Sequence, residues 1–277
     1  ALPRHLPADG RASPEGEVER AALWEGLIAR SVPIERSLEG QIRRVFAVTA
    51  DALTGAMKTL GSPSAAVTDA LAGTMHPLLV RVSRDALPIA MRTGWRRAIE
   101  LVAAVAEKSH ARWQTRAQEY DVAFDMAIPQ LADYIAQRPI RYADGITVRL
   151  AADMRELMGR LANEGASIDQ IGDAVHERFE TISEARAQLI ARTEVGAASN
   201  LASHTAMIEA GVEKHEWLSA RDDLVRRTHR LADGQVVPLT DRFKVGAALL
   251  RYPGDPEGPI DEIADCRCVP IPVVKEV

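Results

Sequence analysis

The pattern of the chain changes at Gly211, and this change constrains the fold more than any other feature of the sequence. Before Gly211, apolar residues recur every three or four positions, and over residues 38–60 they mark one face of an amphipathic helix. After Gly211, short strand-like runs at 212–218, 235–237 and 268–274 are separated by Gly, Pro and Asp. The sequence therefore predicts a mainly α protein, in which a helical N-terminal region is followed by a small C-terminal α+β module.

The length and composition agree with this fold class. A chain of 277 residues can bury one large core or two small ones, and an aromatic content of 4% favours close-packed helices over a β-sandwich. Clusters of Pro, Gly and Asp divide the chain into four expected regions: a flexible arm and short helix at 1–37, a helical region at 38–140, a second helical part at 141–210 and the module at 211–277.

Local signals predict where the helices begin and end. Breaks are expected at four sites rich in Pro or Gly, namely His76-Pro77, Leu87-Pro88, Pro139 and Asp144-Gly145, and the last two also mark a domain boundary. Ser167 and Gln170 form the pattern of a capping box at a helix start. Ser183 is expected to begin a further helix, and Gly211 suits the position just after its C-terminus.

Charge and cysteine content exclude several classes of protein. The net charge of -5 argues against a basic surface that coats nucleic acid. Two cysteines cannot form a disulfide framework, so reduced thiols in a protein made in the cytosol are expected. No apolar run approaches the ~18 residues that cross a bilayer, and the N-terminus lacks the apolar core of a signal peptide. The chain begins at Ala1, which indicates either processing or a fragment of a longer chain.

The last third of the chain carries an ordered set of distinctive residues. In chain order they are Arg192-Thr193-Glu194, Trp217, Asp222 or Asp223, Arg226, His229, Asp233-Gly234, Phe243, Pro253-Gly254-Asp255-Pro256 and Cys266-Arg267-Cys268. This set resembles the Mu F-like family of phage minor head (head morphogenesis) proteins over roughly residues 150–275. Asp265 is a departure, because the family usually carries Asn there.

The resemblance implies a non-enzymatic, minor structural component of a phage head. Such a protein would associate with the portal or the capsid interior and take part in head assembly and in DNA packaging or delivery. Its expected partners are the portal and/or the major capsid protein, and viral DNA. We expect it to be oligomeric or present in several copies, and to lie in the virion after assembly in the host cytoplasm. The helical region 38–140 would then bind the partner.

Cys266 and Cys268 suggest a metal site. They occupy alternate positions of an extended segment, so their side chains are expected on one face, where two thiolates can bind zinc. The resemblance places His229 in the same module as a third ligand. Three weaker candidates are His204, His215 and Asp223.

Two alternatives to this metal site stay open. The thiols can be buried small hydrophobes, with His229 bonded to a backbone carbonyl or to Asp265. Otherwise, the Cys-His pair can serve a metal- or thiol-dependent hydrolase or a toxin-like effector, oriented by Asp223, Asp233 or Asp265. No glycine elbow, oxyanion loop or protease motif accompanies the pair, so a catalytic role is disfavoured.

We expect the polar residues of this region to brace the module. Arg192 is expected to clamp an acidic loop such as Asp261-Glu262, and Glu194 to face Arg226 or Arg227. Trp217 is expected to anchor the small core. The expected structural knot comprises Arg192, Glu194, Trp217, Asp223, Arg226, His229, Asp233, Cys266 and Cys268.

Two basic clusters are candidates for DNA contact. The first lies in the module and comprises Arg221, Arg226, Arg227 and Arg230; these side chains either meet DNA phosphates or pair with the acidic segment 253–268. The second comprises Arg81, Arg84, Arg92, Arg96 and Arg97, beside Trp95 and Trp113. For this second cluster, the solvated side of a helix with a buried tryptophan is favoured over a docking or nucleic-acid surface.

Overall fold

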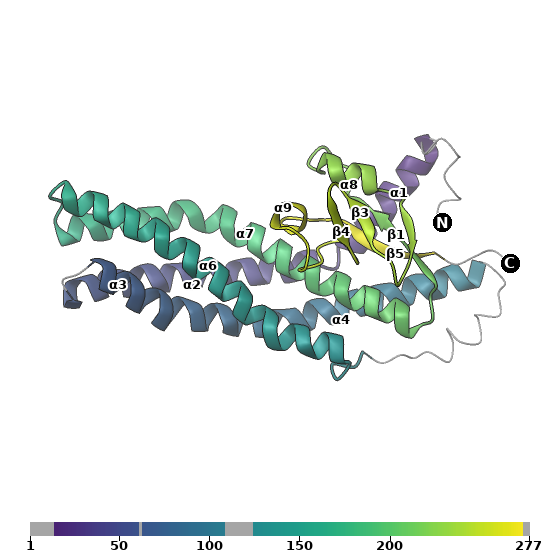
Figure 1. Ribbon diagram of the computed structural model, residues 1–277, viewed down its shortest axis with the longest axis horizontal. Coiled ribbons are helices and arrows are strands. Elements are labelled where there is room, and N and C mark those ends of the chain that lie inside the picture. The colour runs from purple at the N-terminus through teal and green to yellow at the C-terminus, as the bar shows by residue number, and fades with distance from the viewer. Residues whose placement is uncertain (1–13, 61–62, 109–123, 274–277) are drawn as a thin grey trace. The chain divides into compact units, whose positions relative to one another are not determined.

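Helices form most of the computed structural model, which describes residues 14–60, 63–108 and 124–273 (Figure 1). The N-terminal elements are α1 (Pro14–Ile28), α2 (Val32–Leu60), α3 (Pro63–Ala70), the π-helical turn η1 (Leu71–Met75), α4 (His76–Lys108), α6 (Pro129–Asn163) and α7 (Ile168–Glu209). The C-terminal elements are β1 (Lys214–Leu218), α8 (Arg227–Ala232), β2 (Val236–Pro238), β3 (Phe243–Val245), β4 (Ala248–Leu250), α9 (Ile260–Ile263) and β5 (Val269–Val273). The predicted fold class is therefore confirmed. Most of the expected N-terminal arm, and Trp113, lie outside the described residues.

Several helix ends lie where the local signals predict them. The Ser167 amide donates to Gln170 Oε1 at 2.8 Å, and the Gln170 amide donates to Ser167 Oγ at 3.2 Å, which is the reciprocal capping box. At the other end of α7, Gly211 has a φ of 70°, and the Val212 amide donates to the Met207 carbonyl. No described helix is long and apolar enough to cross a membrane.

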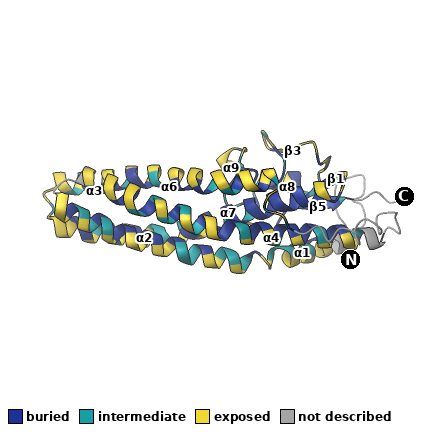
Figure 2. Cartoon of the chain, turned by 90° about the horizontal axis from the view of Figure 1, so that it is seen from below, coloured by how far each residue is buried: buried dark blue, intermediate teal, exposed yellow. Residues whose placement is uncertain are grey.

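Four expected helix breaks are wrong. Pro88 lies inside α4, and Pro139, Asp144 and Gly145 lie inside α6. The break at His76 is replaced by η1, which passes into α4 with helical backbone angles. Buried residues recur along α4 and α6 before and after these positions. Figure 2 shows buried residues along the length of both helices. Burial of a continuous apolar face outweighs the loss of one helical hydrogen bond at each proline.

The expected helix start at Ser183 is also wrong. Ser183 lies inside α7, where its hydroxyl donates to the Glu180 carbonyl at 3.0 Å. A serine that bonds to the preceding turn in this way does not cap a new helix. α7 is therefore one helix of 42 residues.

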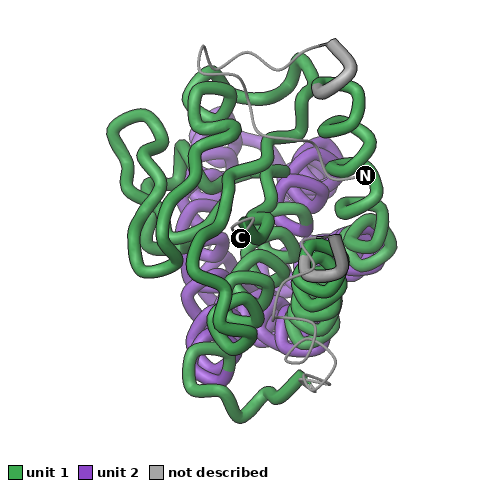
Figure 3. Tube along the Cα trace, turned by 90° about the vertical axis from the view of Figure 1, so that its right-hand side faces the viewer, with its two compact units in different colours: residues 1–35, 87–131, 192–277 green, residues 36–86, 132–191 purple. Residues whose placement is uncertain are grey.

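Contacts group the chain into two units, coloured separately in Figure 3. Unit 1 comprises residues 1–35, 87–131 and 192–277, and unit 2 comprises residues 36–86 and 132–191. In unit 2 the Phe46 and Phe179 rings meet edge to face at 6.2 Å. The four-region division expected from the sequence stays a prediction.

Unit 1 contains the C-terminal module. β1 is the central strand of an antiparallel sheet with the order β2-β1-β5, and β3 and β4 form a separate hairpin. The strands β1, β2 and β5 were predicted, whereas the β3-β4 hairpin was not. One core cluster of the module contains Trp217, Phe243, Leu250, Cys266 and Cys268. A second cluster joins strands β1 and β5 to α4 and to the apolar side of α1.

Candidate functional site

Helix α7 holds the chain segment that carries the two cysteines. Thr193 Oγ1 accepts a hydrogen bond from the Asp265 amide at 2.9 Å, and Arg192 donates to the Asp265 carboxylate at 2.7 Å. Further along the helix, the Asn200 amide group donates to the Cys268 carbonyl at 2.9 Å. Asp265 has a φ of 56°, a left-handed conformation that is uncommon outside glycine. These contacts fix the backbone around the cysteines, whose side chains are both buried.

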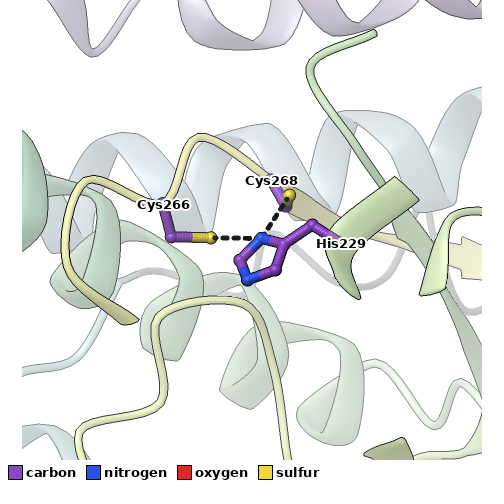
Figure 4. A group of neighbouring side chains, drawn as sticks. All are labelled: His229, Cys266 and Cys268. Carbon is purple, nitrogen blue, oxygen red and sulfur yellow. Dashed lines mark hydrogen bonds between the residues drawn. The ribbon is translucent and has the colours of Figure 1, made fainter. Parts of the chain in front are cut away.

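The two thiols meet one histidine nitrogen. His229, from α8, places Nδ1 3.3 Å from Cys268 Sγ and 3.7 Å from Cys266 Sγ (Figure 4). The other ring nitrogen, Nε2, lies 3.2 Å from Glu262 Oε2, which also accepts a hydrogen bond from Thr228 Oγ1 at 2.8 Å. The imidazole therefore lies between a pair of thiols and a carboxylate.

The three groups shift one another's pKa values. A hydrogen bond from Cys268 lowers the pKa of Cys266 to about 5, with His229 adding to the effect against the opposing effect of burial. Burial raises the pKa of Cys268 well above its usual value, and the neighbouring Cys266 thiolate raises it further. Burial lowers the pKa of His229, but the hydrogen bond and charge of Cys266 outweigh burial and raise it overall. The lowered pKa of Cys266 and the raised pKa of His229 each shift that group towards its charged form.

This triad of His229, Cys266 and Cys268 can act as a buried polar brace or as a set of metal ligands. Among the residues that the structure describes, this triad is the group of His, Cys, Asp or Glu side chains that could hold a metal ion. Its ligand atoms all lie within 4.8 Å of one another. The cysteines are only 5% and 3% exposed, respectively. A nucleophilic thiolate has to reach its substrate, so this burial disfavours catalysis by either sulfur.

The weaker candidate ligands lie elsewhere. His204 and His215 are buried against each other, with ring centroids 5.1 Å apart, and burial lowers their pKa values to about 4 and about 3. Asp223 is exposed. Asp265 binds Arg192, so the acidic partner of the histidine in the triad is Glu262 and not Asp265. Sequence reasoning missed this role of Glu262, because the carboxylate meets the histidine only in the folded chain.

Arg192 contacts the module through a different acidic residue from the one expected. Its guanidinium contacts Asp265 at 2.7 Å and Glu35 at 3.7 Å, and not the predicted Asp261-Glu262 pair. Glu262 instead accepts hydrogen bonds from α8. Burial raises the pKa of Glu35, although the Arg192 charge opposes this shift.

Other members of the expected structural knot occupy different positions around the triad. Trp217 is fully buried and meets the His229 ring edge to face, with centroids 5.4 Å apart. Arg226 donates to the Ala264 carbonyl, and Asp233 accepts from the Ser219 amide at 2.7 Å. Glu194 is buried in α7. The exposed Asp223 does not take part, so this member of the expected knot is wrong.

Some of the arginines in the basic cluster of the module form contacts within the protein. Arg221 pairs with Glu17 and Asp233, and Arg226 bonds to a backbone carbonyl. Arg227 and Arg230 are exposed. Arg221 therefore does not pair with the acidic segment 253–268, and only two of the four arginines have exposed side chains.

The arginines of α4 also divide into two kinds. Arg81, Arg84, Arg92 and Arg96 are exposed and Trp95 is buried, as expected for the solvated side of a helix. Arg97 differs, because it is 2% exposed and donates to Asn200 Oδ1 at 2.7 Å and Ser203 Oγ at 2.8 Å. Burial lowers its pKa to about 10.

A small cavity adjoins the triad within unit 1. Its volume is about 100 Å³, and its walls include Glu35, Arg97, Arg192, Cys266 and Cys268. This is room for a few water molecules, whereas sites for drug-sized ligands are typically about 300 Å³ or larger.

Comparison with known proteins identifies the part of the chain that carries this site. Residues 153–271 match the family model of Phage Mu protein F like proteins. Residues 153–271 are therefore similar to this family, and we call them the Mu F-like segment. The Mu F-like segment contains the whole triad, its Glu262 partner and the Arg192 clamp.

Two curated relatives share part of the chain. Minor head protein GP7 of Bacillus phage SPP1 is 33% identical over 121 residues, which cover 42% of this chain and 38% of that protein. NAD(+)--arginine ADP-ribosyltransferase EFV of Enterococcus faecalis strain V583 is 27% identical over 178 residues, which cover 58% of this chain and 35% of that protein. The chain thus spans little more than a third of each relative. No solved structure matches.

Proposed function

We propose that this protein is a minor structural component of a phage head that binds at the portal or the capsid interior. The observation that carries the proposal is the match of residues 153–271 to the Mu F-like family; the chain is also 33% identical to a phage minor head protein over 121 residues. In this proposal the protein takes part in head assembly and in DNA packaging or delivery. It is present in several copies, and its helical region 38–140 contacts the portal and/or the major capsid protein.

Burial of the candidate nucleophiles supports a non-enzymatic role. The two thiols are nearly inaccessible, and the adjoining cavity is smaller than a nucleotide-sized site. A structural protein needs the rigid module but no substrate pocket.

The proposal is tested with particles of the phage or prophage that encodes the chain. A tagged copy should co-purify with heads, cross-link to the portal, and appear in cryo-electron microscopy as density near one vertex. Arg96→Glu reverses an exposed charge on α4 and should weaken the portal cross-link, whereas Arg227→Glu in the module serves as its matched control. Absence from purified heads, or even decoration of the whole shell, would refute this role.

A second candidate function comes from the relative named as an ADP-ribosyltransferase. An activity of that class would require the chain to bind and cleave NAD⁺. Incubation of the purified protein with NAD⁺ and an arginine-containing acceptor checks this directly. We expect no nicotinamide release above a heat-inactivated control, and clear turnover would favour the toxin-like effector over the structural role.

A further inference from the structure

The His229–Cys266–Cys268 triad has the dimensions of a metal site. In a tetrahedral site with Zn–S bonds of about 2.3 Å and Zn–N bonds of about 2.0 Å, the nitrogen and sulfur ligands lie about 3.5 Å apart. His229 Nδ1 lies 3.3 Å and 3.7 Å from the two sulfurs, and the three ligand atoms all lie within 4.8 Å of one another. An ion can therefore be placed between the three atoms with little movement of any side chain.

The outer nitrogen of the imidazole gives an independent indication of a metal. A metal-bound histidine usually donates its second N–H group to a carboxylate or carbonyl, which fixes the tautomer that leaves the first nitrogen free to bind. Here Nε2 lies 3.2 Å from Glu262 Oε2. Thr228 Oγ1 donates to the same carboxylate oxygen and holds it in place. Nδ1 is thereby left free to bind a metal ion on the side of the two sulfurs.

The two sulfurs converge on one imidazole nitrogen, an arrangement that suits a shared metal ion as well as a hydrogen-bonded cluster. Nδ1 carries at most one hydrogen, yet both sulfurs approach it (Figure 4). A metal ion would bind both sulfurs and the nitrogen at the same time, and thiolate sulfur with imidazole nitrogen suits a borderline-soft ion such as Zn²⁺.

Water from the adjoining cavity can supply the fourth ligand of a tetrahedral zinc site. In the described part of the chain no fourth His, Cys, Asp or Glu ligand joins the triad. The cavity of about 100 Å³ is lined by both cysteines, and it can hold a water molecule within reach of the site.

We propose that His229 Nδ1, Cys266 Sγ and Cys268 Sγ bind one zinc ion, with Glu262 orienting the imidazole and water from the cavity as the fourth ligand. The ion links α8 to the segment just before β5, which are 37 to 39 residues apart in sequence. Its role is to brace the module, and this role does not depend on the proposed place in the phage head.

Elemental analysis of the full chain tests the proposal. Protein purified without a polyhistidine tag and under reducing conditions should contain, or take up, one equivalent of zinc. Cobalt(II) in its place should give the visible absorption of a tetrahedral thiolate site. Cys266→Ser and Cys268→Ser should each lose the ion, whereas Asp223→Asn should keep it, because Asp223 is exposed and outside the triad.

The Glu262→Gln variant and thiol reactivity distinguish a metal from a hydrogen-bonded brace. Glu262→Gln keeps all three ligands and should weaken zinc affinity by about 10- to 100-fold. In the wild-type protein, the two thiols should resist a disulfide reagent until a chelator is added. If a cysteine variant does not fold, the wild-type cobalt spectrum and thiol protection still decide. A wild-type protein that takes up neither zinc nor cobalt, or a Cys266→Ser variant that retains a full equivalent, would overturn the proposal.

Discussion

Lowering the pH from 7 to 5 should destabilise the protein through two touching histidines. His204 and His215 are 6% and 0% exposed, with ring centroids 5.1 Å apart. Burial is the main cause that lowers their pKa values to about 4 and about 3, and the charge of His204 lowers the pKa of His215 further. In an unfolded chain, both would titrate near pH 6.5. Stability is therefore fully present above about pH 6.5 and is lost as the pH falls, because the unfolded chain binds protons that the folded chain does not.

The size of the effect follows from the pKa shifts. Below pH 6.5 each histidine removes about 1.4 kcal/mol of stability per pH unit until its folded pKa is reached. Between pH 7 and pH 5 this is about 2 kcal/mol for one histidine and about 4 kcal/mol for both. Arg251 lowers and Asp255 raises the pKa of His204, so these two charges partly offset each other.

Guanidinium unfolding at pH 7, 6 and 5 measures this loss. Tryptophan fluorescence is a suitable signal, because Trp24, Trp95 and Trp217 all lie in unit 1 with the two histidines. His215→Phe places another ring against the core and should reduce the loss of unfolding free energy between pH 7 and pH 5 by about 2 kcal/mol. His176→Asn alters a partly exposed histidine of unit 2 and serves as the matched control. Equal stability at pH 7 and pH 5, or an unchanged slope in His215→Phe, would contradict the burial argument.

Three further predictions concern close packing, a buried carboxylate and surface charge. Gly94→Ala should lower the unfolding free energy by about 3 kcal/mol in thermal or denaturant melts, because its new Cβ would lie 1.9 Å from the Ser199 carbonyl oxygen. Gly26→Ala, with nothing within 4 Å, should be neutral or slightly stabilising. Asp255→Asn should cost about 2 to 3 kcal/mol in the same melts, since this buried carboxylate accepts bonds from two backbone amides and one guanidinium. If the module contacts viral DNA, Arg227→Ala should reduce the slope of log affinity against log salt by about 1 for any sequence, and an unchanged slope would exclude this arginine.

Features determined by neighbouring residues were predictable from the sequence. The capping box at Ser167 and the left-handed Gly211 depend on residues within one helical turn, and both were predicted correctly. The expected breaks at Pro88 and Pro139 failed, because burial along the whole helix outweighs the local cost of proline. The β3-β4 hairpin was missed, since its three-residue strands are too short to show an alternating pattern.

The sequence predicted which residues form the candidate site, but not which side chains contact one another within it. His229, Cys266 and Cys268 were named together, and the folded chain brings them together. Sequence reasoning did not pair Glu262 with the imidazole, because 33 residues separate the two. The partner of Arg192 was misplaced by a few residues for a related reason: the left-handed turn at Asp265 presents that carboxylate to the helix, and this backbone conformation is not evident from the residue type.

The hydrogen bond from Trp24 Nε1 to the Arg267 carbonyl, 2.7 Å long, joins residues 243 positions apart. Unit 1 therefore cannot complete its core during synthesis until almost the whole described chain has left the ribosome. A product truncated before β5 would leave the apolar side of α1 uncovered, together with one edge of the central strand β1. Exposed apolar surface and an unpaired strand edge are features that proteases and chaperones recognise. Unit 1 therefore loses these features only once the chain has been translated through β5.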